Sequence, residues 1–511
     1  MVLHSRTIAE SLKADHEVFG FARLIDTLDL KDFRKKYSPE GGKAYDPSLI
    51  LSLLIYGYHR GWRSSRELQR ACEENTAMRY LVGDHKIKFR AIAEFRVNFA
   101  DEISDVFKQS VSQVVKRRPT VGKDVKVDGT KIKACAANDQ TYTRQELEAR
   151  KAELDKKILD YLNGGIEDDK RDDAELGDNV GYEMDTEETQ KRIHDFVANQ
   201  KQLLKERRAA EPQPTPKVKP EKPVDPNQQE MFTVAHKLEK INTALSSTDD
   251  KSSDCKINLT DTDARFMKNR GKILQSYNVQ VASSEGFVVA ADIASNNCEN
   301  DLKEMAQALE RAMENTQVTI EKATADSGYF YHTALQFFEE HQIDGYIPSP
   351  QQISKERKGE EDTGFESHHF EYNKKSNTYI CPQGKPLNFH RQFKRDGNDY
   401  FRFHCKPLHC VQCPVREKCC TTKEDIQRGY RSLELGEEHA LKHAMILKMK
   451  SDEAKKACKR RGAEIEPIFG NWKSLRNFWF FLLRGRKKAL TEVKLTATAT
   501  NFGKLVRLAM A

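Results

Sequence analysis

The sequence predicts an α/β fold in which a mixed sheet is flanked by helices and follows an all-helical N-terminal segment. Apolar residues recur at helical spacing up to about residue 115, and alternating, strand-like segments begin only after it. The length of 511 residues exceeds what one core usually holds, so we expect about three domains. With 38% apolar residues the chain can fill several cores, and with 32% charged residues it can keep their surfaces in water.

Residues 1–115 are predicted to form an N-terminal helical domain. Asp46 and Pro47 begin one helix as its N-cap and first helical residue, and Ser64 caps the next. Phe89–Phe99 has the apolar spacing of a third helix. Compact helices joined by short turns are typical of DNA-binding modules. A helical bundle used for packing or dimerisation fits the same pattern equally well.

Strand-like alternation begins at Asp124–Asp128, within residues 116–138, which we take as the first part of the α/β domain. Residues 139–255 interrupt it as a predicted insertion, a helical hairpin followed by a linker. The linker, Glu211–Pro226, holds six of the sixteen prolines. The α/β domain then continues over residues 256–350. Its predicted elements are a hairpin of Ser276–Ala282 and Gly286–Ile293, a helix at Asn300–Asn315, a strand at Ile320–Asp326, a helix at Tyr331–His341 and a strand at Asp344–Ile347.

Three antiparallel strands followed by parallel strands linked through helices is the order of a ribonuclease H-like core. In that order the first strand lies beside the fourth, so Asp128 and Asp326, which end these strands, are expected to lie close together. Residues 351–445 then form a predicted Cys-rich insertion, and residues 446–511 a C-terminal catalytic helix with a basic tail.

The positive charge is concentrated rather than spread. The formal net charge is +7, yet Lys455–Lys488 alone holds eleven Lys and Arg against two acids. Lys116–Lys133 holds seven against two. Both stretches flank the candidate acids, which indicates a polyanionic partner such as DNA.

Three carboxylates are the candidate catalytic residues. Two-metal phosphoryl transfer needs hard oxygen ligands at the ends of adjacent strands and one from a neighbouring helix, and these ligands suit Mg²⁺ or Mn²⁺. Asp128 and Asp326 have the strand positions. For the third we choose Glu466, because Pro467 would begin a helix there and Lys473 lies two turns further on the same face. Glu464 is the rival. A lone aspartate before a glycine is more often a turn former, so the prediction depends on the three acids in combination.

Several segments together resemble the DDE transposases of bacterial insertion sequences. They are YDPSLILSLLIYGYHRGWRSSRELQR, FRAIAEFR, VDGTKIKA, TDTDARFM, SYNVQV, TADSGYF, EPIFGNWKSLRNFWFFLLRG and TATNFGKL. The resemblance implies a ribonuclease H-like domain whose metal-binding acids are Asp128, Asp326 and Glu466. The chain departs from the family at Asn477, where relatives often have Gly, and in its long insertion. Arg461 lies one residue off the spacing that the family shows before the glutamate.

The expected function is transposition: water cuts the element's end, and the freed 3′-hydroxyl attacks target DNA. Alternatives are a ribonuclease H-like nuclease that does not join, and a non-catalytic DNA-binding protein. Paired DNA ends imply a homodimer. The predicted phosphate contacts are Lys131, Arg461, Lys473, Arg476 and Arg484. The alternative is that these basic side chains only face solvent and bind no phosphate. The longest apolar stretch, Leu49–Tyr58, is about half a membrane span, so we expect a cytoplasmic protein without a membrane partner.

Five of the eleven cysteines lie between Cys405 and Cys420, in a chain whose N-terminus has no secretion signal. A disulfide framework is therefore not expected. A close C-x₂-C pair with two further thiolates is typical of a structural zinc site, and the predicted ligands are Cys381, Cys410, Cys413 and Cys419. Possible substitutes are Cys405, His404, His409 and Cys420. Reduced free thiols in a β-rich insertion are the alternative.

Overall fold

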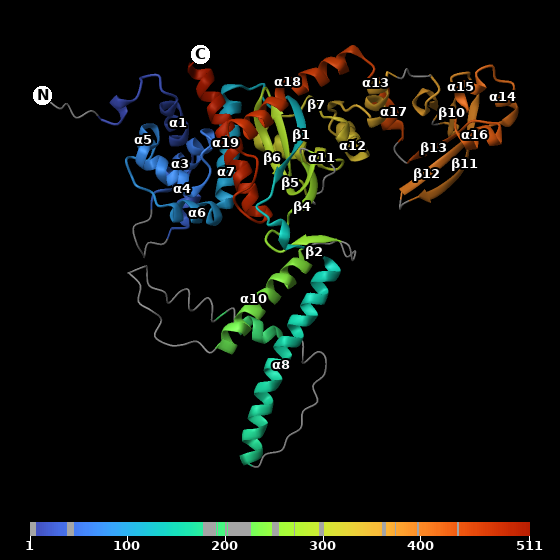
Figure 1. Ribbon diagram of the computed structural model, residues 1–511. Coiled ribbons are helices and arrows are strands. Elements are labelled where there is room, and N and C mark those ends of the chain that lie inside the picture. Colours follow the sequence, from blue (N-terminus) through green and yellow to red (C-terminus); the bar gives the residue numbers. More distant parts are fainter. Residues whose placement is uncertain are drawn as a thin grey trace. The chain divides into compact units, whose positions relative to one another are not determined.

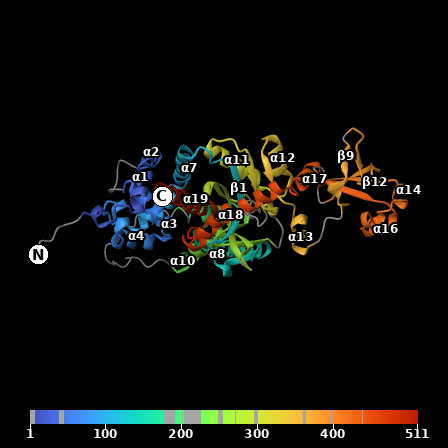
Figure 2. The ribbon, with the colours of Figure 1, turned by 90° about the horizontal axis from the view of Figure 1, so that it is seen from above.

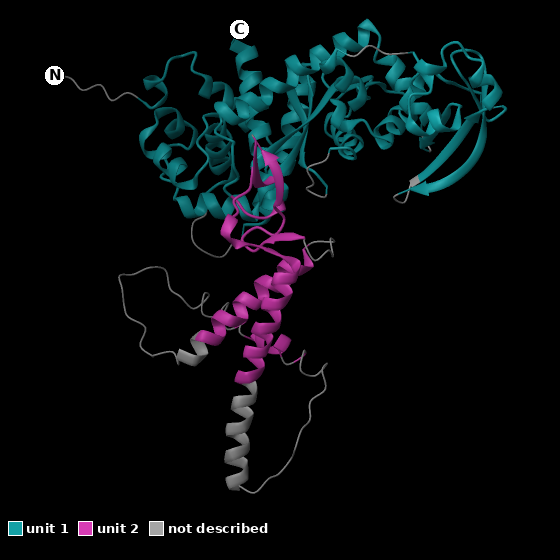
Figure 3. Ribbon diagram, turned by 45° about the vertical axis from the view of Figure 1, so that its right-hand side comes forward, with its two compact units in different colours: residues 1–132, 277–482, 487–511 teal, residues 133–276, 483–486 magenta. Residues whose placement is uncertain are grey.

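The computed structural model describes residues 7–37, 45–176, 191, 193–199, 202, 226–247, 255–269, 271–295, 301–359, 364–373, 375–395, 398–436 and 439–510. These form two compact units (Figure 3). The first comprises residues 1–132, 277–482 and 487–511, and the second comprises residues 133–276 and 483–486. Residues 211–225 of the predicted linker lie outside the described residues.

The N-terminal part of the first unit is helical, as predicted. Its helices are α1 (Glu17–Asp26), α2 (Lys31–Lys35), α3 (Pro47–His59), α4 (Ser65–Glu74), α5 (Thr76–Leu81), α6 (Phe89–Asn98) and α7 (Ala100–Arg117). Asp46 caps α3 by accepting from the backbone N–H of Ser48, and Ser64 caps α4 by accepting from that of Glu67. Every residue of α3 from Ile50 to Tyr58 is buried, so this helix is the centre of the helical core.

A six-stranded mixed sheet follows (Figure 1). Its strands are β1 (Asp124–Lys133), β4 (Arg265–Asn269), β5 (Lys272–Ser284), β6 (Phe287–Ile293), β7 (Lys322–Thr324) and β8 (Asp344–Tyr346). The order is β4-β5-β1-β7-β8, and β6 pairs with β5. β5 is antiparallel to β4 and β6, whereas β7 is parallel to both β1 and β8. The fold is therefore mixed α/β, and the expectation that the first strand pairs with the strand before Asp326 is confirmed.

Two boundaries differ from those expected. β1 continues past Asp128 to Lys133, since the ladder partners of a strand, and not only the local sequence, decide where it ends. The hairpin between β5 and β6 turns at Glu285 and Gly286, both with positive φ (49° and 69°), instead of around residues 283–285. Such a pair matches the twist of the two strands. The predicted helices are present as α11 (Glu304–Thr316) and α12 (His332–Glu340).

The second unit contains two helices that lie within residues 139–255, the range interpreted as an insertion. Its elements are β2 (Thr141–Thr143), β3 (Lys256–Asn258), the helix α8 (Arg144–Leu176) and the helix α10 (Pro226–Ser246). β2 and β3 pair at the base of the two helices. Ile158 of α8 packs in one apolar cluster with Met231 and Leu238 of α10, and a second cluster joins the same helices near β3.

After α13 (Pro350–Lys358), the first unit contains a small antiparallel lobe, which we call the cysteine lobe, residues 364–436. Its strands are β9 (Glu371–Asn373), β10 (Thr378–Ile380), β11 (Pro386–Arg395), β12 (Asn398–Cys405) and β13 (Ser432–Gly436), in the order β13-β12-β11-β10-β9. Three short helices join β12 to β13: α14 (Pro407–Val411), α15 (Arg416–Cys419) and α16 (Lys423–Arg428).

Three helices complete the chain: α17 (His439–Lys448), α18 (Asp452–Ser474) and α19 (Arg486–Met510). α18 lies alongside the sheet, in contact with β7 and β8 (Figure 2). α19 is buried over nearly all of residues 489–503, so it forms part of the core of the first unit. Among the described helices, none combines the length and the apolarity needed to cross a membrane.

Candidate catalytic centre within β1 and after β7

Asp128 and Asp326 lie together because their strands pair in parallel. The register matches Asp124 with Lys322 and Lys126 with Thr324. Asp128 and Asp326 each lie two residues further along the chain, where the charge of Asp326 acts on the Asp128 carboxyl. The Oδ1 atom of each carboxylate accepts a backbone N–H at 2.8 Å, from Gly129 and Gly328 respectively. Backbone N–H groups thus orient both carboxylates, Asp128 within β1 and Asp326 just after β7.

The surroundings of Asp128 disfavour an unaccompanied negative charge. Burial raises the pKa of this carboxyl, the guanidinium of Arg461 lowers it and the charge of Asp326 raises it, so that the net pKa is about 6. Arg461 Nη1 donates to Asp128 Oδ2 at 2.9 Å. Two neighbouring carboxylates, one of them paired with Arg461, are a donor set that suits a divalent metal ion.

Glu466 lies on a longer helix than expected. The prediction that a helix begins at Pro467 is wrong, because α18 begins at Asp452 and ends at Ser474 with Pro467 inside it. Ser451 caps α18 by accepting from the N–H of Ala454, and this start precedes the proline by fifteen residues.

Glu466 and Lys473 nevertheless share one side of α18, two turns apart. Lys473 Nζ donates to Thr130 Oγ1 at 2.6 Å, two residues beyond Asp128. The Glu466 side chain is exposed, and in the described part of the chain it forms no ion pair. The structure therefore brings Asp128 and Asp326 together and leaves Glu466 on the neighbouring flank of α18.

The rival acid, Glu464, has a different partner. It lies 3.1 Å from Lys126 Nζ, and Asp124 lies 2.9 Å from the same atom. Lys126 is only 2% exposed, so it requires this compensation. Glu464 thus neutralises a buried lysine, which is a structural task.

A fourth carboxylate, Asp301, was missed by the sequence analysis. Its Oδ1 accepts from the side-chain amides of Asn278 and Gln280, both at 2.6 Å, and its Oδ2 lies 3.3 Å from Lys131 Nζ. The phenol of Tyr329 donates to Gln280 Oε1. This network borders Asp128 and Asp326, so it forms the polar surroundings of the two acids.

One signal could have revealed the network. Asn278 and Gln280 alternate with Tyr277, Val279 and Val281 along β5, and all five are buried. Polar residues at every second position of a buried strand need partners inside the protein, so they indicate a polar site. Asp301 carries no such local signal.

Replacing Gly129 by alanine is expected to damage the centre. An added Cβ would lie 2.8 Å from Gln280 Nε2 and 3.0 Å from Asp301 Oδ1, so the amide–carboxylate network would have to move. Displacing groups that support metal ligands typically costs about 10–100-fold in activity. DNA cleavage rates of Gly129→Ala would test this, with Gly470→Ala as control, because no atom lies within 4 Å of its added Cβ. Wild-type cleavage by Gly129→Ala would contradict the expectation.

The remaining predicted phosphate contacts are placed differently. Lys131 is paired with Asp301. Arg476 is only 5% exposed, contacts His59 Nδ1 at 3.2 Å and lines two cavities with Arg507. Burial lowers the Arg476 pKa to about 10. Arg484 belongs to the second unit, where its Nε donates to the backbone oxygen of Cys135.

The cysteines of the cysteine lobe converge. The lining of one small cavity includes Cys381, Cys405, Cys410, Cys413, Cys419 and Cys420, together with the substitute His409. The other substitute, His404, stacks on His390 instead, with ring centroids 4.2 Å apart. A separate group, Glu366, His368 and His369, brings three ligand atoms within 4.8 Å. Lys355 already forms an ion pair with Glu366.

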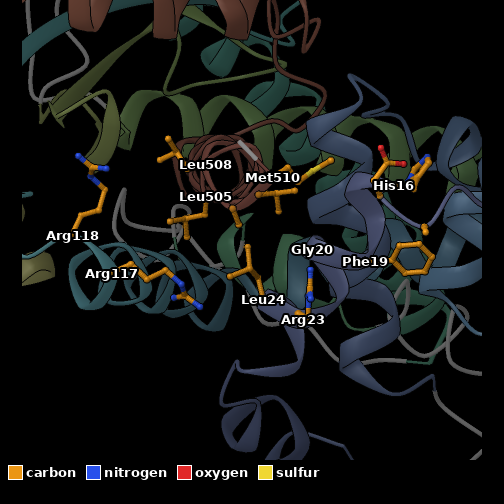
Figure 4. Close-up of a pocket in the computed structure, with 14 residues that line it drawn as sticks. His16, Phe19, Gly20, Arg23, Leu24, Arg117, Arg118, Leu505, Leu508 and Met510 are labelled. Carbon is orange, nitrogen blue, oxygen red and sulfur yellow. The ribbon is translucent and has the colours of Figure 1, made fainter.

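A larger cavity, of about 530 Å³, lies between α1, the end of α7 and the end of α19 (Figure 4). Arg23, Arg117 and Arg118 line it together with apolar side chains such as Leu505 and Met510. Neither Asp128 nor Asp326 lines it, so it is not part of the candidate catalytic centre.

Two family models match the chain. The model described as Transposase domain (DUF772) matches residues 6–98, the N-terminal helices. The model described as Transposase DDE domain matches residues 380–506, from the cysteine lobe through α18 and into α19. No curated protein and no solved structure matches the chain.

Proposed function

We propose, from the membership of this chain in the DDE-class transposases of insertion-sequence type, that it cuts DNA at the ends of its element and joins the freed ends to target DNA. The observation that carries the proposal is the parallel pairing of β1 with β7, which supports a shared site for Asp128 and Asp326, two residues beyond the last matched pair. The order β6-β5-β1-β7-β8 supports it, since it is the strand order of a ribonuclease H-like core.

The metal-binding residues of this proposal are Asp128, Asp326 and Glu466. When bound, two Mg²⁺ or Mn²⁺ ions would activate the attacking oxygen and stabilise the leaving oxygen of an in-line displacement. Asp128 and Asp326 supply adjacent carboxylates, and Glu466 supplies a third from the flank of α18. The donor set consists of oxygen atoms, as these hard cations prefer.

Basic side chains around these acids are proposed to hold the DNA backbone. Arg461 compensates Asp128 in the free protein, and its guanidinium can turn to a phosphate once a cation takes over that compensation. Lys473 and Lys131 lie next to the same edge of the sheet through Thr130 and Asp301. Because two DNA ends must be processed together, we propose that the active form is a homodimer.

The test is a strand-transfer assay. A donor plasmid carrying the DNA that flanks the gene, and an unmarked target plasmid, are incubated with the protein and Mg²⁺ or Mn²⁺. We expect nicked donor ends followed by joined products. Cleavage without joining would replace the proposal by a nuclease, and DNA binding without cleavage would replace it by a non-catalytic DNA-binding protein.

Replacing Lys473 by methionine is expected to weaken DNA binding at every sequence. Loss of one phosphate contact lowers the slope of log Kd against log salt concentration by about 1. Binding titrations from low to physiological salt would measure it. Lys108→Met removes an exposed lysine from α7 and is the control. An unchanged slope for Lys473→Met would show that this lysine contacts no phosphate.

A further inference from the structure

The cysteine lobe has little apolar material to hold it together. Its core consists of Phe370, Tyr379, Leu387, Phe403, Leu433 and Leu435 with two buried cysteines. β11 is exposed along most of its length after Leu387. A lobe on the order of 70 residues with so small a core usually needs an additional cross-link or a metal ion to be stable.

Four segments of the lobe contribute thiols to the lining of one cavity. Cys381 follows β10 directly, and Cys405 is the last residue of β12. Cys410 lies on α14, and Cys419 ends α15. The shared cavity has a volume of about 30 Å³, which suits a single ion or a water-sized body. The described cysteines are all free thiols, so no disulfide uses these sulfurs.

Backbone N–H groups already point at two of the sulfurs. Lys385 donates to Cys381 Sγ at 3.3 Å across a turn that Gly384 permits with its φ of +73°. Arg431 donates to Cys410 Sγ at 3.5 Å. A neutral thiol is a weak acceptor, whereas a metal-bound thiolate is commonly stabilised by such second contacts. The two backbone N–H groups would therefore stabilise thiolates at Cys381 and Cys410.

The spacing selects the ligands among the six cysteines. Cys410 and Cys413 form a C-x₂-C pair joined by a turn in which the N–H of Cys413 donates to the oxygen of Cys410 at 3.2 Å. Cys405 is buried and its thiol is a hydrogen-bond partner of Cys410. A thiol in that position can donate to a ligand sulfur without itself binding a metal.

We propose that Cys381, Cys410, Cys413 and Cys419 bind one structural Zn²⁺ ion that closes the cysteine lobe. Four thiolates about 2.3 Å from zinc stand about 3.8 Å from one another, in a closed tetrahedral site. Among the residues described, three ligand atoms within 4.8 Å of one another occur in the Glu366 group and not in this cavity, so the four sulfurs would have to move closer together to bind zinc. Metal binding releases the thiol protons, four for four neutral thiols.

The first test is the metal content of the full-length protein, produced without a polyhistidine tag. We expect about one zinc per chain in wild type. Cys410→Ser and Cys413→Ser are expected to lose it, while Cys405→Ser, in the same cavity, and Cys255→Ser, in the second unit, retain it. Wild type without zinc overturns the proposal. Loss in Cys405→Ser with retention in Cys413→Ser overturns the assigned ligand set.

A second measurement covers variants that do not fold. Wild-type protein stripped with a chelator is expected to become sensitive to protease within residues 364–436, and Zn²⁺ should restore its resistance. Co²⁺ should restore it too, with the strong visible absorption of a tetrahedral thiolate site. Unchanged protease resistance, or Co²⁺ bound without that absorption, overturns the proposal. Neither readout requires transposition, and Asp326→Asn should keep its zinc. Failure of the zinc proposal can therefore be distinguished from failure of the proposed function.

Discussion

Replacing Asp128 or Asp326 by asparagine is expected to reduce both DNA cleavage and strand transfer by more than about 100-fold. Losing a metal ligand should lower activity more than losing a residue that only supports a ligand, which typically costs about 10–100-fold. Each substitution keeps the shape of the side chain and its bond to the following N–H, but removes the charge that a divalent cation needs. Cleavage of end-labelled DNA at saturating Mg²⁺ would measure the loss.

The matched control is Asp124→Asn, four residues earlier on β1. Asp124 shares Lys126 with Glu464, so the buried lysine keeps one acid partner in this variant. We expect activity close to wild type. DNA binding should survive in Asp128→Asn and Asp326→Asn, because neither carboxylate attracts the phosphate backbone. Near-normal cleavage by either variant would remove that acid from the proposed metal-binding set.

Glu466 needs a separate comparison with Glu464. Glu466→Gln is expected to lose cleavage with little change in folding, because its side chain is exposed. Glu464→Gln should keep cleavage close to wild type, because Asp124 still pairs with the buried Lys126 in this variant. If instead Glu464→Gln lost cleavage while folding normally, the third acid would have to be reassigned.

Local interactions made much of the fold predictable. Asp46 and Ser64 cap helices within three residues of themselves, so their neighbours in the sequence are enough to show it. The alternation in β5 and β6 shows two strands with a short connection, and the hairpin follows. The positions of Asp128 and Asp326 followed from strand order, which decides the neighbours in a sheet.

Long-range contacts were not predictable in the same way. Lys131 and Asp301 are 170 residues apart, and nothing near Asp301 in the sequence indicates that it meets this lysine. The start of α18 was misjudged because proline favours the first turn of a helix. Proline also tolerates a place inside a helix when packing supports the helix, and here Ile465 and Ile468 are buried on either side of Pro467.

The largest expected loss of stability comes from replacing Glu492 by glutamine. Glu492 is fully buried on α19, and its Oε2 lies 2.6 Å from Arg63 Nη2. Arg63 also donates to the backbone oxygens of Asn477 and Phe480, both at 2.7 Å. Glu492 Oε1 accepts the N–H of Leu482. This ion pair therefore connects the N-terminal helices to α19 and to the chain that follows α18.

Glu492→Gln leaves the Arg63 guanidinium buried without a counter-charge, which typically costs about 3–5 kcal/mol. Denaturant unfolding, with proteolytic cleavage within residues 487–510 as the readout, would measure the change in the free energy of unfolding. The double variant Arg63→Met/Glu492→Gln should recover part of the loss, because no unpaired charge remains buried. Lys487→Met is the control: its pair with Asp101 also joins α19 to the N-terminal helices, but both side chains are exposed, so little change is expected. Equal unfolding midpoints for Glu492→Gln and Lys487→Met would mean that burial does not strengthen the Arg63–Glu492 pair, and that other contacts hold α19 against the N-terminal helices.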